Sequence, residues 1–211
     1  MRLSIKEIFK STHGSYVIEP ASEDVVATGL VWDSREVSEG CIYLALPGER
    51  VDGRVFVAQA FGKGAVCALV MGDVDEAAMD AARDSGLAII SVANTYKAIE
   101  DLAAYWRGKL NGRVIGLSGS TGKTTTKNLV RDVLSAHGSV VATQGNQNNE
   151  IGVPKTLLSA EPDTTSVVVE MGMRGLHQLD ALCSFVKPSW GLLTNVGESH
   201  IELLGSRENI A

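Results

Sequence analysis

Short apolar runs alternate with segments whose apolar residues recur at helical spacing along the first half of the chain. The predicted elements of this half are strands at 25–32, 41–46, 65–71 and 87–92 and helices at 55–63 and 76–85. Polar, glycine-containing segments separate them, as is typical of turns. Strands that alternate with helices predict a small α/β unit.

The same alternation continues in the second half, after a candidate N-cap at Asn94 that opens a helix over 95–110. Strands are predicted at 113–118, 139–143, 165–171 and 189–196, helices at 125–138 and 175–185, and a further helix start at Ser206. Continued alternation of this kind implies a mainly parallel sheet covered by helices.

The length of 211 residues allows two small domains, and the change of pattern before Asn94 places them at 1–93 and 94–211. The overall fold class predicted is α/β. Apolar residues make up 45% and charged residues 21%, with both signs interspersed, so an ordinary globular protein is expected.

A net charge of -6 argues against a general binder of nucleic acid or of anionic membranes. The three cysteines are widely spaced and form no CxxC pair, so neither a disulfide framework nor a zinc site is indicated. The N-terminus lacks the apolar core of a signal peptide, and no run is long enough to span a membrane. A cytoplasmic monomer is expected.

The segment GSTGKT at 119–124 follows a predicted strand and precedes a predicted helix. Glycines in such a loop let backbone N–H groups approach phosphate oxygens at a helix N-terminus. A lysine there reaches the β and γ phosphates, and the next hydroxyl takes a Mg²⁺ position. The pattern therefore predicts ATP binding by Gly119, Ser120, Thr121, Gly122, Lys123, Thr124 and Thr125.

The match to the phosphate loop is to the shorter form G-x-x-G-K-T. Leu117 stands where the strict pattern G-x-x-x-x-G-K-[ST] has glycine, and Gly116 comes one place early. The alternative is a Gly-Ser turn before an ordinary helix, with Lys123 solvated.

Magnesium prefers oxygen ligands, so a carboxylate is expected near the phosphates. Glu170 ends the apolar run SVVVE, at the carboxyl end of a strand, where parallel-sheet proteins bind their ligands. The alternative is a solvated glutamate at a strand end.

Two further groups follow strands of the second domain. His200 lies just past a predicted strand and is either a ligand or acid-base group or an ordinary surface histidine. Asn146, Asn148 and Asn149 crowd a loop after another strand, where ligand contact and simple turn chemistry are both open.

Four segments, in this order and spacing, resemble the Mur ligases: GSTGKTTTK, GNQNNEIGVP, VVVEMGMRG and TNVGESHIELLGS. In the first domain, DSREVSEGCIYLALPGERVDGRVF is similar to the family's uridine-nucleotide domain, with its D-[ST]-R and L-x-G-E-x-x-D-G-H-x-F patterns. Arg54 stands where that pattern commonly has histidine. The resemblance covers nearly the whole chain.

The resemblance implies a role for each matching residue. The residues that would face a UDP-muramoyl-peptide are Ser34, Arg35, Gly48 and Asp52, with Asn148 and Asn149 near the reacting substrate. The catalytic residues would be Lys123, Glu170 and His200, and the metal ligands Thr124, Glu170 and His200.

The chemistry implied is ATP- and Mg²⁺-dependent amide bond formation through an acyl phosphate, in the synthesis of peptidoglycan precursors. The asparagine-rich loop indicates the branch whose substrates are UDP-N-acetylmuramoyl-tripeptide and D-alanyl-D-alanine. Family members continue well beyond position 211, through a lysine that is often carbamylated and into a C-terminal domain. We therefore expect this chain to be a fragment.

Three other functions stay open at this point. One is the family member that adds the third amino acid, and another is a P-loop small-molecule kinase, although such kinases usually begin with the lysine loop. The third is a non-catalytic fragment that binds nucleotide without turnover.

Overall fold

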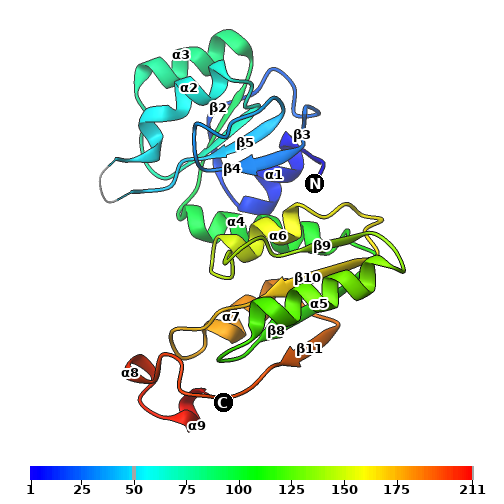
Figure 1. Cartoon of the computed structure of the whole chain (residues 1–211). Helices are drawn as coiled ribbons and strands as arrows, with labels where there is room; N and C mark the ends of the chain where they lie inside the picture. The colour runs from blue at the N-terminus through cyan, green and yellow to red at the C-terminus, as the bar shows by residue number, and fades with distance from the viewer. Residues whose placement is uncertain (49–50, 211) are drawn as a thin grey trace. The chain divides into compact units, whose positions relative to one another are not determined.

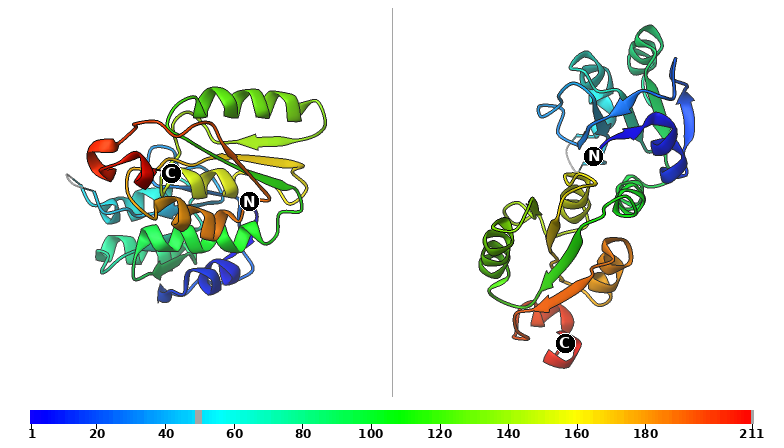
Figure 2. Two further views of the ribbon diagram at one scale, coloured as in Figure 1. Left: turned by 90° about the horizontal axis from the view of Figure 1, so that it is seen from below. Right: turned by 90° about the vertical axis from the view of Figure 1, so that its right-hand side faces the viewer.

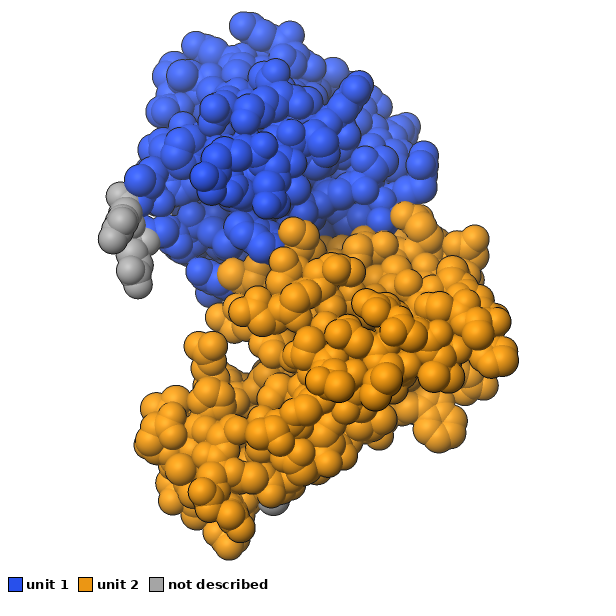
Figure 3. Space-filling model, in the orientation of Figure 1, with its two compact units in different colours: residues 1–102 blue, residues 103–211 orange. Residues whose placement is uncertain are grey.

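The computed structural model describes residues 1–48 and 51–210, which form two compact units, 1–102 and 103–211 (Figure 3). Helix α4 (Thr95–Arg107) contains the boundary between them. Both units are α/β, as predicted. The division concerns packing alone, so the domain limits 1–93 and 94–211 and the roles assigned to them stay predictions.

Unit 1 is built around a five-stranded sheet in the order β2-β7-β6-β5-β4 (Figure 1). Its elements in chain order are β1 (Leu3–Ser4), α1 (Ile5–Thr12), β2 (Ser15–Ile18), β3 (Val26–Ala27), β4 (Gly29–Val31), β5 (Cys41–Leu44), the 3-10 helix η1 (Gly53–Phe56), α2 (Val57–Gly62), β6 (Cys67–Val70), α3 (Glu76–Ser85), β7 (Ala88–Ser91) and the first residues of α4. Strand β2 pairs antiparallel with β7, and the other neighbours are parallel.

The core of unit 1 lies between this sheet and helices α2 and α3. Tyr43 of β5, Phe61 of α2 and Ala82 of α3 belong to one buried cluster. The Tyr43 hydroxyl donates a hydrogen bond to the Gly53 carbonyl at 2.9 Å, so the one polar atom of this side chain is satisfied. Because β4 and β5 are parallel, the segments that follow them begin at the same edge of the sheet.

The predicted strand over 25–32 is wrong as one element. Strand β3 pairs with β1 in a separate two-stranded sheet, whereas β4 pairs with β5. Between them, Thr28 N donates to Gly40 O at 2.8 Å, so the chain changes partners at this residue. Apolar periodicity indicates that residues on both sides of Thr28 are buried, but it does not show which strand each half pairs with.

Unit 2 holds a four-stranded parallel sheet in the order β11-β8-β10-β9. After α4, its elements are β8 (Arg113–Ser118), α5 (Lys123–Ser135), β9 (Val140–Ala142), α6 (Gly152–Leu158), β10 (Ser166–Glu170), α7 (Gln178–Val186), β11 (Trp190–Leu193), α8 (Ile201–Leu204) and α9 (Arg207–Ile210). The predicted N-cap is confirmed, since Asn94 Oδ1 accepts from Tyr96 N at 2.8 Å.

Helix α5 covers one face of this sheet, and α6 and α7 cover the other (Figure 2). This arrangement follows from right-handed crossovers that run in opposite directions, from β8 to β9 and from β10 to β11. The direction reverses between the neighbouring strands β8 and β10, and ligands bind outside the carboxyl ends of strands at such a point. No helix among the described residues combines the length and apolar character needed to cross a membrane.

Candidate nucleotide and metal site

The glycine loop connects the end of β8 to the start of α5, as the sequence predicts. Gly119 has φ +136° and Gly122 has φ +78°, both in the region that favours glycine. A Cβ at Gly119 would clash with Thr194 Oγ1. These conformations place the loop directly before the N-terminus of α5, where N–H groups and the helix dipole favour an anion.

A second segment, Thr194–Ser199, follows β11 and grips this loop. The Asn195 carboxamide accepts from Thr121 N at 3.3 Å through Oδ1 and donates to Thr121 O at 3.0 Å through Nδ2. The backbone carbonyl of Asn195 accepts from Ser120 N at 3.0 Å. Thr194 Oγ1 donates to Thr121 O at 2.7 Å. The conformation of the loop therefore depends on the end of a strand that was predicted far along the chain, although the sequence analysis gave Thr194 and Asn195 no role.

Lys123 lies folded over its own loop. Its Nζ donates to Gly119 O at 2.6 Å and to Ser120 O at 3.3 Å. Both acceptors are backbone carbonyls of the glycine loop, so the ammonium lies over this loop. Thr125 lies exposed in the first turn of the same helix.

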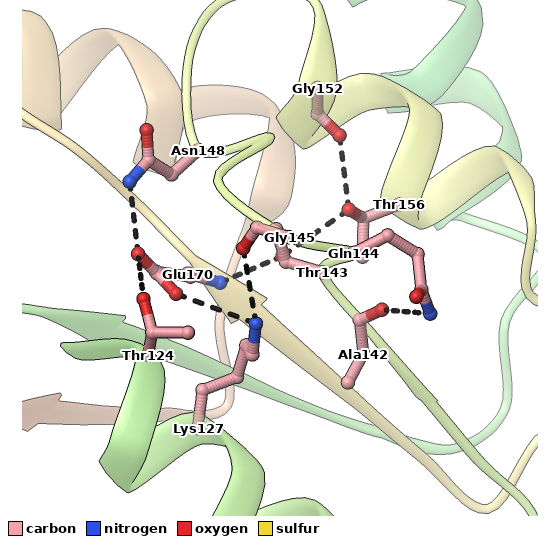
Figure 4. A network of polar contacts seen from close by, with 10 residues as sticks. All are labelled: Thr124, Lys127, Ala142, Thr143, Gln144, Gly145, Asn148, Gly152, Thr156 and Glu170. Atoms are coloured by element: carbon pink, nitrogen blue, oxygen red, sulfur yellow. Dashed lines mark hydrogen bonds and ion pairs between the residues drawn. The ribbon is translucent and has the colours of Figure 1, made fainter.

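Glu170 is the centre of a buried polar network at the end of β10 (Figure 4). Its side chain is only 1% exposed. The carboxylate oxygen Oε1 accepts from Asn148 Nδ2 at 2.9 Å and from Thr124 Oγ1 at 3.3 Å. Three residues predicted from separate segments of the sequence are thus in direct contact.

The other carboxylate oxygen faces a buried lysine that the sequence did not single out. Lys127 Nζ lies 3.6 Å from Glu170 Oε2 and donates to Gly145 O at 3.3 Å. A signal existed: Lys123, Lys127, Val130 and Leu134 follow helical spacing on the less exposed side of α5, so a cation occupies a core-facing position.

The donor set at Glu170 fits a Mg²⁺ ion. Oε2 is buried and accepts no hydrogen bond from any described residue, because 3.6 Å to Lys127 is an ion-pair distance. Glu170 Oε1 and Thr124 Oγ1 lie 3.3 Å apart, so two oxygen atoms of the kind that Mg²⁺ prefers are already close together. The described residues hold no group of three or more His, Cys, Asp or Glu side chains arranged for a metal, and Mg²⁺ needs only one or two carboxylates beside phosphates and water.

His200 lines a pocket that Lys123 and Asn195 also line. It has φ +59° at the start of α8, and its Nδ1 lies 4.0 Å from Glu202 Oε1. No direct contact with Glu170 is present. Asn149 is engaged differently from Asn148, since its Oδ1 accepts from Gly152 N at 3.0 Å at the start of α6.

The predicted site residues of unit 1 follow β4 and β5. The exposed Arg35 guanidinium forks onto Asp33, with Nη2 2.6 Å from Oδ2, and these hydrogen bonds lower the Asp33 pKa to about 2. Asp52 and Arg54 form the same kind of pair, with Arg54 Nη2 2.8 Å from Asp52 Oδ2. Arg54 also donates to Asp73 O at 2.8 Å, so the residue that departs from the histidine pattern anchors its own loop.

Burial raises the pKa of Tyr43 to about 12, and the negative charges of Asp33 and Asp52 add to this rise. Ser34 is buried, and its carbonyl accepts from Lys63 Nζ at 2.8 Å. Gly48 is exposed, and a Cβ there would clash with Val51 O. The neighbouring Glu49 and Arg50, part of the same predicted motif, lie outside the described residues.

Two family profiles match the chain. The Mur ligase middle domain matches residues 117–211, and the profile described as Mur ligase family, catalytic domain, matches residues 26–107. The chain belongs to the Mur ligase family. The glycine loop and Glu170 lie in the middle-domain match, and Arg35 and Asp52 lie in the other.

Curated relatives and solved structures agree with this assignment. The Synechocystis UDP-N-acetylmuramoyl-tripeptide–D-alanyl-D-alanine ligase is 43% identical over 90% of this chain and 40% of the relative. The crystal structure of MurF from Acinetobacter baumannii has a TM-score of 0.86 at 31% identity, over 100% of this chain and 44% of that chain. The MurF ligase from Thermotoga maritima, solved in complex with ADP, has a TM-score of 0.76 at 32% identity, over 87% of this chain and 41% of that chain. This Mur ligase chain spans less than half the length of the relatives it matches.

Proposed function

We propose that this chain is the nucleotide-binding part of a ligase that joins D-alanyl-D-alanine to UDP-N-acetylmuramoyl-tripeptide with ATP. The observation that carries the proposal is the contact of Thr124 and Asn148 with Glu170 beside the glycine loop. Two relatives that share 31% and 43% identity with this chain are ligases of this kind by name, and they supply the substrate class.

ATP binds at the N-terminus of α5 in this proposal. The backbone N–H groups of the glycine loop take the phosphate oxygens, and Lys123 exchanges its two carbonyl partners for the β and γ phosphates. The exchange requires little movement, because the ammonium already lies over the loop. The relative from Thermotoga maritima was solved in complex with ADP, which supports nucleotide binding in this family.

Thr124 and Glu170 would hold Mg²⁺, with His200 as a candidate for a second ion because it lines the pocket beside Lys123. Bound Mg²⁺ supplies neutralisation of phosphate charge. Thr124 and Glu170 are held ready for this role by their contacts with each other and with Asn148.

The reaction is a transfer followed by a substitution. A carboxylate oxygen of the tripeptide bonds to the γ phosphorus while the bond to the ADP oxygen breaks. The D-alanyl-D-alanine amine then attacks the acyl carbon, and the tetrahedral intermediate releases phosphate and a proton as the amide forms. The chain contributes positioning and positive charge through Lys123 and the helix N-terminus.

Unit 1 holds the UDP group of the peptide substrate in this proposal, through Ser34, Arg35, Gly48 and Asp52. The exposed guanidinium of Arg35 and its fork geometry suit a diphosphate. Cytoplasmic location and a monomeric state stay predictions.

Calorimetric titration tests the two sites separately. The chain is titrated with UDP-N-acetylmuramoyl-tripeptide and, in a second experiment, with Mg²⁺ and a non-hydrolysable ATP analogue. Binding of both is expected. A folded chain that binds the ATP analogue but not the UDP-peptide would contradict the ligase assignment and favour a P-loop kinase, whose product would be a phosphate ester formed without an amine.

A further inference from the structure

Lys127 is 2% exposed, and such burial is unusual for a lysine. Ordering its long side chain also costs conformational entropy. Apolar side chains of similar volume often replace buried ion pairs with no loss of stability. Stability alone therefore gives a weak reason for a cation at this position of α5.

The contacts of Lys127 connect two parts of the site. Its ammonium donates to Gly145 O in the asparagine-rich loop and lies 3.6 Å from Glu170 Oε2. The loop in turn sends Asn148 to the other oxygen, Oε1, at 2.9 Å. The carboxylate is thus held from both sides, and Figure 4 shows the lysine and the asparagine on opposite oxygens.

A carboxyl group can rotate about its last bond with little resistance. Attraction between Oε2 and Lys127 fixes that rotation, which keeps Oε1 toward Thr124 and Asn148. Gly172 N donates to Asn148 O at 2.7 Å, so the loop is also tied to the residues that follow β10. The side chain of Lys127 is too buried to take part in nucleotide binding without rearrangement.

We propose that Lys127 is a positioning residue, which orients the Glu170 carboxylate for the nucleotide-bound metal and holds the asparagine-rich loop against it. The inference rests on the proposed nucleotide and metal site. Lys127 acts through Glu170 and touches neither ATP nor the metal.

The test compares ADP affinity with and without Mg²⁺, measured by calorimetry on the 211-residue chain, in Mg²⁺ and in EDTA. The wild-type chain is expected to gain affinity from Mg²⁺. Lys127→Met keeps the length of the side chain and removes its charge, and should reduce that gain about tenfold, as loss of an outer partner of a metal ligand typically does. The metal-free affinity should change less than about twofold, because no contact with nucleotide is lost.

The matched control is Arg131→Met, which removes a cation one helical turn further along α5 whose side chain is 42% exposed. It should retain the full Mg²⁺ gain. A Lys127→Met chain with the wild-type gain would overturn the inference, since a residue that only fills space would give this result. Equal loss of metal-free and Mg²⁺-dependent affinity would also overturn it.

A further pair of variants covers the case in which Lys127→Met leaves Glu170 unpaired and the chain unfolded. Glu170→Gln alone is compared with Glu170→Gln combined with Lys127→Met, which buries no charge at either position. The two should bind ADP equally in Mg²⁺, because Lys127 has lost the group through which it acts. Weaker binding by the double variant would refute the inference. A wild-type chain that binds ADP with no gain from Mg²⁺ would refute the proposed metal site as well.

Discussion

The two units place charged residues after parallel strands in contrasting ways. In unit 1, Asp33 with Arg35 and Asp52 with Arg54 pair across two positions of the chain, at partly or fully exposed sites. In unit 2, the pair of Lys127 and Glu170 joins α5 to the end of β10 and is almost completely buried. One arrangement is made locally, and the other requires the complete sheet.

The contrast matters because exposure decides what an ion pair can do. An exposed pair adds little stability and is screened by salt, so its guanidinium can turn to a ligand at small cost. A buried pair loses much stability when one partner is removed, but it keeps its geometry while a ligand binds. Unit 1 is therefore adaptable where unit 2 is preorganised.

The largest effect that this comparison predicts is on Glu170. Glu170→Ala leaves the Lys127 ammonium buried without its partner, and should lower the free energy of unfolding by about 3–5 kcal/mol. Asp52→Ala, at a partly exposed pair that also caps η1, should lower it by only about 1 kcal/mol. Urea denaturation followed by circular dichroism measures both, and similar midpoints for the two variants would remove the distinction between the units.

The glycine loop gives the next effect. Gly119→Ala combines an unfavourable φ with a clash against Thr194, and should lower the free energy of unfolding by about 3 kcal/mol. Gly122→Ala is the matched control, because nothing lies within 4 Å of its Cβ position and only the left-handed backbone costs energy, about 1 kcal/mol. Thermal unfolding of both variants checks the difference, and equal melting temperatures would argue against the clash.

Lys123→Ala separates the two units by function. It removes charged hydrogen bonds to phosphate, worth about 1.5–3 kcal/mol, so binding of a non-hydrolysable ATP analogue should weaken about tenfold to a hundredfold. Binding of UDP-N-acetylmuramoyl-tripeptide should survive. Calorimetry with each ligand is the measurement, and equal loss of both by a folded variant would contradict the model of two separate binding platforms.

The smallest effect concerns acid titration in unit 1. Hydrogen bonds from Arg35 lower the Asp33 pKa from 3.8 to about 2. The small contribution of this pair to folding stability is therefore present above pH 4 and is lost as the pH falls toward 2. In Arg35→Ala, the midpoint should return toward 3.8. Carboxyl NMR titration reads this directly, and a wild-type midpoint near 3.8 would show that the fork does not persist in solution.

Local sequence patterns predicted those parts of the fold and of the site that depend on residues close together in the sequence. The glycine loop is specified by adjacent residues, and Glu170 by its place after an apolar strand. The helix α1 was missed although its signal is equally local: Ser4 and Glu7 form a capping box, with Glu7 N donating to Ser4 Oγ at 3.2 Å.

The other parts depend on which strand ends meet, and periodicity contains no such information. Asn195 is only a residue near the end of a predicted strand, with no assigned role, until β11 is known to lie beside β8. Lys127 shares a helical face with Val130 and Leu134, but its partner Glu170 is unknown until α5 is placed against β10. The roles of these two residues follow from tertiary packing, which overrides local preference.

The grip of segment Thr194–Ser199 on the glycine loop also sets an order in time. The loop leaves the ribosome long before the strand that holds it, so the N–H groups of Ser120 and Thr121 have no Asn195 to meet while β11 is unmade. Parallel strands pair only after the intervening crossover has formed. The phosphate site is therefore among the last features of unit 2 to be completed during synthesis.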